Sequence, residues 1–579
     1  MAKHQGRSHG SVFWIVSILF FVVLPTVAEA QTLGDEWKQG LKPEAVADHG
    51  MVNTQNPLTT EAAVDVLRRG GNAVDAMITS VIMDHVVDTH QNSHFGSMSG
   101  IYFEAATGEY HVISAVSQRP DSQVCGSGDP SRVAIGGVIR GLEALWERWG
   151  SLPWSEYFEQ AIRHADEGVQ VTSFMYLRNG TRLEGGEFTA NEVARRNYMP
   201  DGHLVPVGER WKMPLLAEHL RRLAAEGADY MYEGEWAQDF VDQANRRGYC
   251  VTMADMAGYS PVWQEPVRFT YRDHEFIGSP PPDRGGAEVG YNLKILEHFD
   301  LKELGHYSES PEAMEVIART FGRVQQETSS VINDPLNFQV PFGIWLDEEY
   351  ARFGAEFVRG SMRQPGVELA AGPGQWPPGE RALHEEVGGG GEVDWPEEAE
   401  VSSNHNVIVD SDGNWFSALH TGHGGAPGIW MDGHRTTGST AHAFTSGPGR
   451  RLVLPITTIM IARPGEDAPW LAMGTPGSPP QPVTQVLINM FDYEMHPSEA
   501  VDAPRFWAFR GTPRAPVIRS ESRLSESVRR GLRMSGIGIQ DIGEYHWGTG
   551  SMQIVWRDRE TNRLHGVTDP RRLGRAAGH

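Results

Sequence analysis

One stretch predicts the fold, and it reads Val401-Ser402-Ser403-Asn404-His405-Asn406-Val407-Ile408-Val409-Asp410-Ser411-Asp412-Gly413-Asn414-Trp415-Phe416-Ser417-Ala418-Leu419-His420-Thr421-Gly422-His423. Two runs of strand-forming residues, 406–410 and 415–420, flank Asp412-Gly413. An Asp-Gly step between such runs is a strong signal for a β-hairpin. The hydroxyl residue Ser403 therefore lies at the start of the first predicted strand.

The segment before this hairpin has a different composition. Residues 361–400 combine four consecutive glycines, several prolines and many glutamates without a hydrophobic period, which is typical of a flexible linker. A cut at the end of this linker would make Ser403 an N-terminal residue. Its α-amino group, with an ordinary pKa near neutrality, would then serve as the base for its own hydroxyl. The sequence thus predicts an N-terminal nucleophile.

The overall composition is that of a globular enzyme. The 579 residues are 40% hydrophobic and 22% charged. A formal net charge of −25 opposes binding to nucleic acid and to anionic membrane surfaces, so we expect a small-molecule substrate. The sequence lacks the motifs of α/β-hydrolases, zincins, P-loop enzymes and dinucleotide-binding folds, and we expect no cofactor.

Several histidines follow one another closely and raise the question of a metal. They are His405, His420, His423, His434 and His442. No second set of ligands lies at a spacing typical of a metal site. We therefore favour histidines in a polar pocket or on the surface, and expect no metal.

The first thirty residues have the three parts of a signal peptide. Lys3 and Arg7 precede an apolar run, 12–27, which Pro25 interrupts and Ala28-Glu29-Ala30 follows. This pattern predicts removal of residues 1–30 and export to the periplasm or the medium, with an uncleaved membrane anchor as the alternative. No later stretch reaches the length of a membrane span, so we expect no stable membrane insertion after the signal is removed.

The chain has only two cysteines, Cys125 and Cys250. They could form one disulfide in an oxidising compartment, or both could remain thiols.

Helical and strand patterns extend over the rest of the chain. A helix is predicted over 60–69 and stops at Gly70-Gly71, and Asn72 caps a second, buried helix over 73–87. Residues 92–100 read as a loop before a strand at 101–104, and residues 279–286 as a rigid loop before a helix. Further helices are expected at 142–168, 215–225 and 482–491, and further strands at 452–462, 470–473 and 552–556.

Motifs in both halves of the chain resemble those of the gamma-glutamyltransferase (gamma-glutamyltranspeptidase) family of N-terminal nucleophile hydrolases. They are Pro57-Leu58-Thr59-Thr60-Glu61-Ala62, Gly70-Gly71-Asn72-Ala73, Leu152-Pro153-Trp154, Tyr232-Glu233-Gly234, Pro280-Pro281-Pro282, Gly285-Gly286, Asp334-Pro335, Ala503-Pro504-Arg505 and Asp569-Pro570-Arg571-Arg572. The resemblance implies an α+β fold with four layers, αββα. It also implies self-cleavage before the nucleophile, here into segments 31–402 and 403–579, which remain each other's partners as large and small subunits.

The resemblance assigns candidate catalytic residues. Ser403 takes the place of the family's threonine nucleophile and keeps its hydroxyl and its future amine. Thr421 matches the threonine that supports the nucleophile's amine. The family's oxyanion-binding glycine pair matches Gly477 and Ser478, whose backbone N–H groups would do that work.

The residues that would bind the substrate differ more from the family. Val116 stands where the family has the arginine that binds the glutamyl α-carboxylate, and Arg119 lies three residues further on. Val453 and Leu454 replace a pair of serines, His423 replaces an asparagine, and Ala443 replaces the aspartate that binds the amine. Losing these partners should weaken zwitterion binding by several kcal/mol, so we expect a more apolar acyl pocket.

Three functions follow from these observations. The first is an exported amide hydrolase or acyltransferase with altered acyl specificity. The second is a true gamma-glutamyltransferase that binds the carboxylate elsewhere, through Arg119 or Arg450. The third is an inactive homologue that serves as a binding protein.

Overall fold

The predicted hairpin lies at the centre of a β-sheet. Strands β10 (Asn404–Val409) and β11 (Trp415–Thr421) pair antiparallel, from Asn404 opposite His420 to Val409 opposite Trp415. Gly413 has a φ of 87°, a left-handed conformation that glycine adopts without strain, and this closes the turn. The first strand begins two residues earlier than the sequence pattern indicates, directly after Ser403.

The computed structural model describes residues 40–121, 128, 130–184, 186, 188–362, 403–436, 447–477, 480–512 and 515–579. All of them belong to one unit, Leu33–His579. The predicted signal peptide, residues 363–400 of the predicted linker and the candidates Ala443 and Ser478 lie outside the described residues. Cys125 also lies outside the described residues. Cys250, the other cysteine, is disulfide-bonded.

Within the described residues, two seven-stranded sheets form the middle of the molecule, and all neighbouring strands in them are antiparallel. The first sheet has the order β21 (Arg575–Gly578), β2 (Met51–Thr54), β10, β11, β3 (Ser97–Glu104), β4 (Glu109–Ala115) and β7 (Val262–Gln264). The second has the order β1 (Ala45–Ala47), β20 (Leu564–Thr568), β19 (Gln553–Arg557), β15 (Pro469–Gly474), β14 (Thr458–Ala462), β9 (His274–Gly278) and β8 (Val267–Tyr271).

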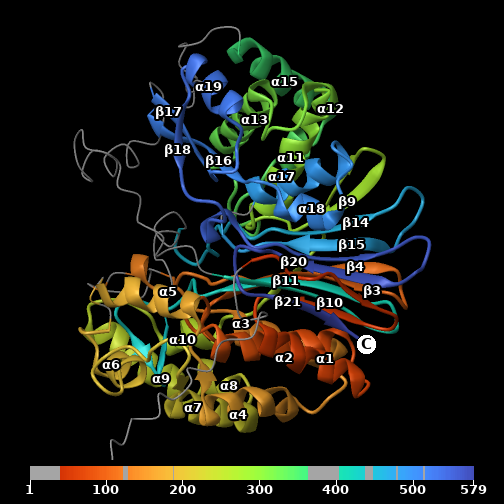
Figure 1. Cartoon of the computed structure of the whole chain (residues 1–579). Helices are drawn as coiled ribbons and strands as arrows, with labels where there is room; N and C mark the ends of the chain where they lie inside the picture. Colours follow the sequence, from red (N-terminus) through yellow and green to blue (C-terminus); the bar gives the residue numbers. More distant parts are fainter. Residues whose placement is uncertain are drawn as a thin grey trace, which may run out of the picture. The chain divides into compact units, whose positions relative to one another are not determined.

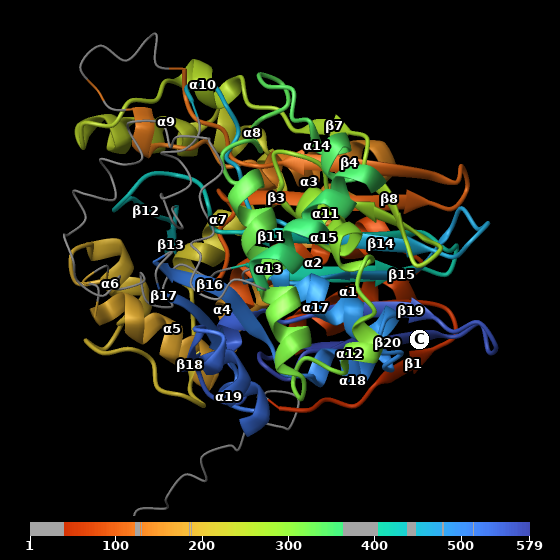
Figure 2. The ribbon, with the colours of Figure 1, turned by 90° about the horizontal axis from the view of Figure 1, so that it is seen from above.

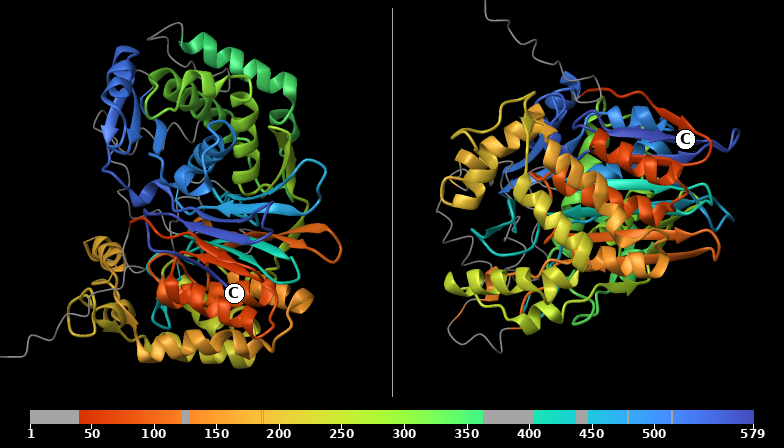
Figure 3. Two further views of the ribbon diagram at one scale, coloured as in Figure 1. Left: turned by 45° about the vertical axis from the view of Figure 1, so that its right-hand side comes forward. Right: turned by 90° about the horizontal axis from the view of Figure 1, so that it is seen from below.

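The two sheets stack face to face through an apolar layer (Figure 3). Alternate residues of the first sheet, among them Val407, Val409 and Trp415, meet Met460 and Val555 of the second. Because side chains on a strand point to opposite faces in turn, the residues between them on β10 face the helices instead.

Helices cover the outer face of each sheet (Figures 1 and 2). Helices α1 (Pro57–Arg68), α2 (Ala73–Val87) and α3 (Val138–Trp149) pack on the first sheet. The second sheet is covered by α11 (Gly285–Leu296), α13 (Pro311–Thr328), α15 (Glu348–Met362) and α17 (Pro480–Phe491). The predicted α+β class and four-layer αββα arrangement are therefore confirmed.

Capping residues set the ends of the two helices next to the hairpin. Asn56 accepts a hydrogen bond from the N–H of Leu58 at the start of α1, and Gly70, with a φ of 89°, follows its end. Asn72 and Asp75 form a reciprocal capping box at the start of α2. Every residue of α2 is buried, since it lies between the sheet and neighbouring helices.

The remaining elements surround this core. They are α4 (Glu159–Glu167), α5 (Ser173–Glu184), α6 (Glu192–Tyr198), α7 (Pro214–Glu226), α8 (Asp229–Tyr232), α9 (Glu235–Arg246), α10 (Met253–Ala257), α12 (Leu301–Leu304), α14 (Phe342–Trp345), α18 (Pro497–Asp502), α19 (Glu526–Met534), and the strands β5 (Val169–Gln170), β6 (Arg210–Trp211), β12 (Trp430–Met431), β13 (His434–Arg435), β16 (Phe506–Thr512), β17 (Ala515–Ser520) and β18 (Gly538–Asp541). No helix in the described ranges is both long enough and apolar enough to cross a bilayer.

Besides the earlier start of β10, three predicted elements differ from the structure. The helix predicted over 142–168 is two helices, α3 and α4, because the chain turns through Gly150 and Pro153. The strand predicted over 452–462 begins only at Thr458; residues 452–456 include Pro455 and contribute instead to a small apolar cluster. Strand β3 begins at Ser97, inside the predicted loop.

Candidate active site

The register of the hairpin brings the two hydroxyl residues predicted to be catalytic together. Ser403 directly precedes β10 and is 8% exposed. Because Asn404 pairs with His420, the next residue along β11, Thr421, lies opposite Ser403. Thr421 is also buried and pairs with Ser97 of β3. The predicted nucleophile and its predicted supporting residue therefore share one end of the first sheet.

A buried carboxylate lies under this end of the sheet. Asp84 of α2 accepts hydrogen bonds from Thr59 Oγ1 at 2.5 Å and Asn406 Nδ2 at 2.9 Å. The His420 ring nitrogen Nε2 lies 3.0 Å from Asp84 Oδ2. The carboxylate thus joins α1, α2, β10 and β11, and fixes the strand that Ser403 precedes to its neighbour β11.

A second carboxylate lies one turn further along, closer to Ser403. Asp88 accepts hydrogen bonds from Asn404 Nδ2 at 2.8 Å and Asn56 Nδ2 at 3.2 Å. Burial, followed by the charge of Asp84, raises the pKa of Asp88 to about 7, although both asparagines and Arg572 act in the opposite direction. Neither acid is predicted from the sequence. The only signal is two acidic residues one turn apart at the end of an otherwise apolar segment.

His405 connects the two sheets close to the nucleophile. Its Nε2 lies 2.9 Å from Ser417 Oγ, and burial lowers its pKa to about 3, so the ring is neutral at physiological pH. A Cβ at Gly474, the last residue of β15, would lie 2.3 Å from the same nitrogen. Only glycine fits there, and this close approach sets the position of the loop that carries Gly477.

Gly477 lies just beyond β15 in a conformation that favours glycine. Its φ is 104°, and an added Cβ would come within 3.1 Å of the backbone at Gly548 and Gly550. Thr475 Oγ1 accepts a hydrogen bond of 2.6 Å from the N–H of Ser551, which fastens the two loops together. Ser478, the other predicted oxyanion-binding residue, is outside the described residues.

Arg572 connects these loops to the nucleophile. Its Nε donates to the carbonyl of Trp547 at 3.2 Å, and its Nη1 to the carbonyl of Ser403 at 3.4 Å. The side chain is fully buried, and burial lowers its pKa to about 10, against the effect of Asp569 and Asp88. Arg572 belongs to the Asp569-Pro570-Arg571-Arg572 motif, but its place beside the nucleophile is not predicted from the sequence.

The predicted substrate-binding residues separate into two groups. Val116 and Leu454 are fully buried in one apolar cluster with Leu419, which precedes Thr421 by two residues on β11. We call it the apolar cluster; it contains Val116, Ala134, Leu419, Leu452, Leu454 and Ile456. Val453, in contrast, is only partly buried and packs against the core on the outer side of the second sheet.

Two other predicted residues, His423 and Arg119, make backbone hydrogen bonds near this cluster. The carbonyl of His423 accepts hydrogen bonds from Ser97 Oγ at 2.7 Å and Ser117 Oγ at 2.6 Å. Arg119 is 7% exposed, and its N–H donates to the carbonyl of Arg450 at 2.9 Å. The two arginines considered as carboxylate ligands thus lie on adjacent segments.

Buried histidines form a continuous row behind the hairpin. Ring centroids are 5.3 Å apart between His420 and His85, 4.3 Å between His85 and His94, and 5.2 Å between His94 and His219. In the described part of the chain, no three His, Cys, Asp or Glu side chains are arranged to hold a metal ion. His442 and the His434 side chain are outside that part.

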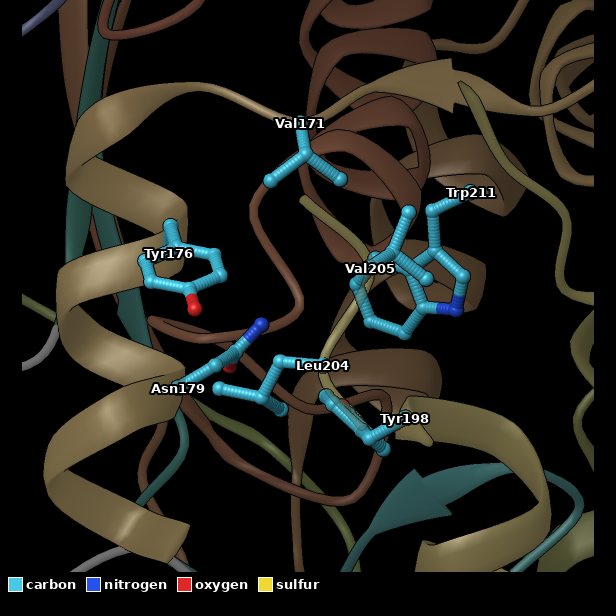
Figure 4. Close-up of a pocket in the computed structure, with 7 residues that line it drawn as sticks. All are labelled: Val171, Tyr176, Asn179, Tyr198, Leu204, Val205 and Trp211. Carbon is cyan, nitrogen blue, oxygen red and sulfur yellow. The ribbon is translucent and has the colours of Figure 1, made fainter. Parts of the chain in front are cut away.

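A small hollow lies beside α5 (Figure 4). Its lining residues are Val171, Tyr176, Asn179, Tyr198, Leu204, Val205 and Trp211. Asn179 begins an Asn-Gly-Thr glycosylation triplet, but it is 5% exposed and faces this hollow, so the folded chain does not present it as an acceptor.

Comparison with known proteins agrees with this geometry. The family model described as Gamma-glutamyltranspeptidase matches residues 59–579. This chain belongs to the gamma-glutamyltranspeptidase family. The predicted family resemblance is therefore confirmed, and with it the broad class of N-terminal nucleophile amide hydrolases and acylases.

Individual members of the gamma-glutamyltranspeptidase family match over nearly the whole chain. Acylase ACY 1 proenzyme of Pseudomonas sp. (strain SE83) is 27% identical over 527 residues, which cover 86% of this chain and 88% of the relative. Glutathione hydrolase proenzyme of Escherichia coli (strain K12) is 26% identical over 567 residues, 91% of each chain. The crystal structure of cephalosporin acylase from Bacillus halodurans shares the fold, with a TM-score of 0.76 over 93% of this chain and 97% of that one, at 23% identity.

Proposed function

We propose that this chain is an exported, self-processing amide hydrolase that uses Ser403 as its nucleophile. Signal removal after Ala30 and a cut between Ser402 and Ser403 would give the subunits 31–402 and 403–579. The observation that carries the proposal is the place of Ser403, which is buried directly before the central strand β10 and lies opposite Thr421. The names of the relatives, both proenzymes, support a cut of this kind.

Self-cleavage needs no group from outside the chain except water. Ser403 Oγ attacks the carbonyl carbon of Ser402, the C–N bond breaks, and the nitrogen takes up the hydroxyl proton to become the new α-amino group. Water then hydrolyses the resulting ester, which leaves a carboxylate on Ser402 and restores the Ser403 hydroxyl.

The mature enzyme would use the same hydroxyl on a substrate. The α-amino group of Ser403 accepts the hydroxyl proton while Oγ attacks the amide carbonyl, and it then delivers the proton to the departing amine. Water hydrolyses the acyl ester, or a second amine takes up the acyl group. The N–H of Gly477 is suited to stabilise the oxyanion, because the tight contact with Gly548 and Gly550 fixes its loop.

The acyl group would enter the apolar cluster. Val116, Leu419 and Leu454 offer no partner for the charges of an α-amino acid, and removing those charges from water without compensation costs several kcal/mol. Acyl groups without the zwitterion of a gamma-glutamyl group should therefore be preferred.

A panel of p-nitroanilides with gamma-glutamyl, pentanoyl and glutaryl acyl groups tests the proposal. We expect release of p-nitroaniline from an acyl group without the zwitterion and a lower kcat/KM for the gamma-glutamyl compound. The Ser403→Ala variant is the control, and it should release none. A clear preference for the gamma-glutamyl compound would overturn the proposed specificity and make Arg119 and Arg450 the next residues to mutate. An intact, inactive wild-type chain would instead favour a binding protein.

A further inference from the structure

Three buried arginines lie together beside the nucleophile. Arg178 and Arg182 come from α5, and Arg572 follows β20. Their exposed fractions are 1%, 6% and 1%. We call Arg178, Arg182 and Arg572 the arginine site.

Aromatic rings hold the arginine site together. The guanidinium carbons of Arg178 and Arg572 lie 4.6 Å and 5.5 Å from the ring centroid of Trp547. The ring centroid of Phe174 lies 5.6 Å from the ring centroid of Trp547 and 5.6 Å from the guanidinium carbon of Arg572. Arg182 Nη2 donates a hydrogen bond of 2.5 Å to the carbonyl of His90. Cation–π contacts of this kind orient guanidinium groups.

The charges of all three arginines act on the ring of His90. His90, at the edge of the site, has a pKa well below its ordinary value, because of burial first and then of Arg182, Arg178 and Arg572. Neither ring nitrogen of His90 has a hydrogen-bond partner among the described residues. The three guanidinium groups therefore act together, as positive charges, on the buried His90 ring.

One N–H donor group of Arg572 is not used. Its Nη2 is buried and has no hydrogen-bond partner among the described residues. Asp569, the acid that most raises its pKa, is already bound by Arg505 at 2.5 Å and Arg571 at 3.2 Å. Asp88, the other acid that acts on Arg572, has a pKa of about 7 and so carries only part of a charge at neutral pH. A buried donor without a partner is costly, and an anion would satisfy it.

Arg572 of the arginine site and Leu419 of the apolar cluster lie toward opposite neighbours of the strand that Ser403 precedes. In the sheet, β10 has β2 on one side and β11 on the other. Arg572 Nη1 is 3.5 Å from the side-chain oxygen of Gln55, which directly follows β2. Leu419 of the apolar cluster is on β11. An amide held over Ser403 would thus extend toward β2 on one side and β11 on the other. One half would lie near Arg572 and the other half near Leu419.

We propose that the arginine site binds a carboxylate on the amine half of the substrate. This inference rests on the proposed function, in which the apolar cluster takes the acyl half. The substrate class is then an N-acyl amino acid or a related amide, with an apolar acyl group on one side and a carboxylate close to the scissile nitrogen on the other. Guanidinium groups pair with carboxylates through two parallel hydrogen bonds, and burial strengthens such pairs.

Two chromogenic amides test this inference. N-pentanoyl-p-nitroaniline and the pentanoyl amide of 5-amino-2-nitrobenzoate differ only by a carboxylate on the leaving amine. With the wild-type enzyme, we expect kcat/KM to be about tenfold higher for the carboxylate compound, mostly through a lower KM. Arg178→Gln should lower this ratio about fivefold or more, and Arg178→Lys, which keeps the charge, should lower it less. Arg533→Gln, at an arginine whose side chain is 57% exposed on α19, should leave the ratio unchanged.

Equal kcat/KM values for the two amides, or a ratio that Arg178→Gln leaves unchanged, would overturn the inference. A binding measurement separates this failure from failure of the proposed function. Calorimetry with 5-amino-2-nitrobenzoate and with p-nitroaniline needs no turnover. If the wild-type protein binds the benzoate more tightly than p-nitroaniline and Arg178→Gln abolishes this preference, the arginine site is supported even when neither amide is hydrolysed. Equal binding of the two amines overturns the inference. If Arg178→Gln does not fold, Arg182→Gln, which also removes one charge of the arginine site, replaces it in both measurements.

Discussion

Asp84 and His420 lie 3.0 Å apart, Oδ2 to Nε2, and neither side chain is exposed to solvent. Their contact joins α2 to β11 at the position opposite Asn404, the residue after the nucleophile. Because Asp84 also binds Thr59 and Asn406, the nucleophile strand is fixed from below by one carboxylate.

Replacing Asp84 by Asn should destabilise the protein strongly. Asparagine has the same shape, but its NH₂ group would face one of the donors that the carboxylate now satisfies. We expect a loss of about 3 kcal/mol in the free energy of unfolding, measured by chemical denaturation. Asp65→Asn is the matched control: its partner Arg69 is an exposed neighbour at 3.0 Å, and its loss should cost at most about 0.5 kcal/mol. Equal effects of the two variants would contradict the role given to Asp84.

Self-cleavage should depend on the hydroxyl at position 403. Purified wild-type protein should give two bands on a denaturing gel, with Ser403 at the N-terminus of the smaller one by sequencing. Ser403→Ala should give one uncut band, and Ser403→Thr, which keeps the hydroxyl, should still be cut. A wild-type chain that stays in one piece after long incubation would show that the nucleophile assignment is wrong.

Val116→Arg alone should not restore turnover of a gamma-glutamyl substrate. Val116 is fully buried among Leu419, Leu454 and their neighbours, so a new guanidinium would have no acceptor beside it. We expect kcat/KM for gamma-glutamyl-p-nitroanilide to rise less than about threefold, since the loss is distributed over several positions. The apolar cluster would also be less stable, and the melting temperature should fall. A large gain in gamma-glutamyl turnover would show that one residue decides the specificity.

Asp283 should make the stability of the protein depend on pH. Asp283 is fully buried next to Leu454, and burial raises its pKa to about 8. The neighbouring Ser99 offsets this rise in pKa only in part, because its hydroxyl makes no well-aligned hydrogen bond to the carboxyl group. Because the folded-state pKa lies above the unfolded one, this residue favours the folded state below about pH 4. That contribution is lost as the pH rises to about 8.

Asp283→Asn removes this titration while keeping the shape of the side chain. Above pH 8, the variant should be more stable than the wild type by about 2 kcal/mol or more, and the difference should shrink toward pH 4. Thermal melting from pH 4 to pH 9 measures the trend, with the exposed Asp201→Asn as the control. Parallel curves for wild type and Asp283→Asn would contradict a buried, neutral Asp283.

Local signals predicted those parts of the fold that depend on near neighbours. The Asp412-Gly413 turn and the Asn72 cap were predicted because each is set by residues only a few positions apart. The same holds for α2, which spans 73–87 as predicted. The strand expected from residue 452 begins only at Thr458. Its apolar residues fit a strand, but Pro455 interrupts the ladder, and Leu454 forms an isolated bridge to Asp283 rather than part of a strand.

The sequence alone determined the hairpin, the capped helices and Ser403 as the candidate nucleophile, because turn chemistry, helix caps and hydrophobic period are written in adjacent residues. Only the tertiary structure decided which distant groups meet. Asn53 donates to the carbonyl of Ile554, Asp84 binds His420, and Arg178 and Arg572 share Trp547, although hundreds of residues separate most of these partners. No spacing rule connects such residues. They meet because each sheet must bury one face against the other sheet and one face against helices, and that packing sets which side chains surround the nucleophile.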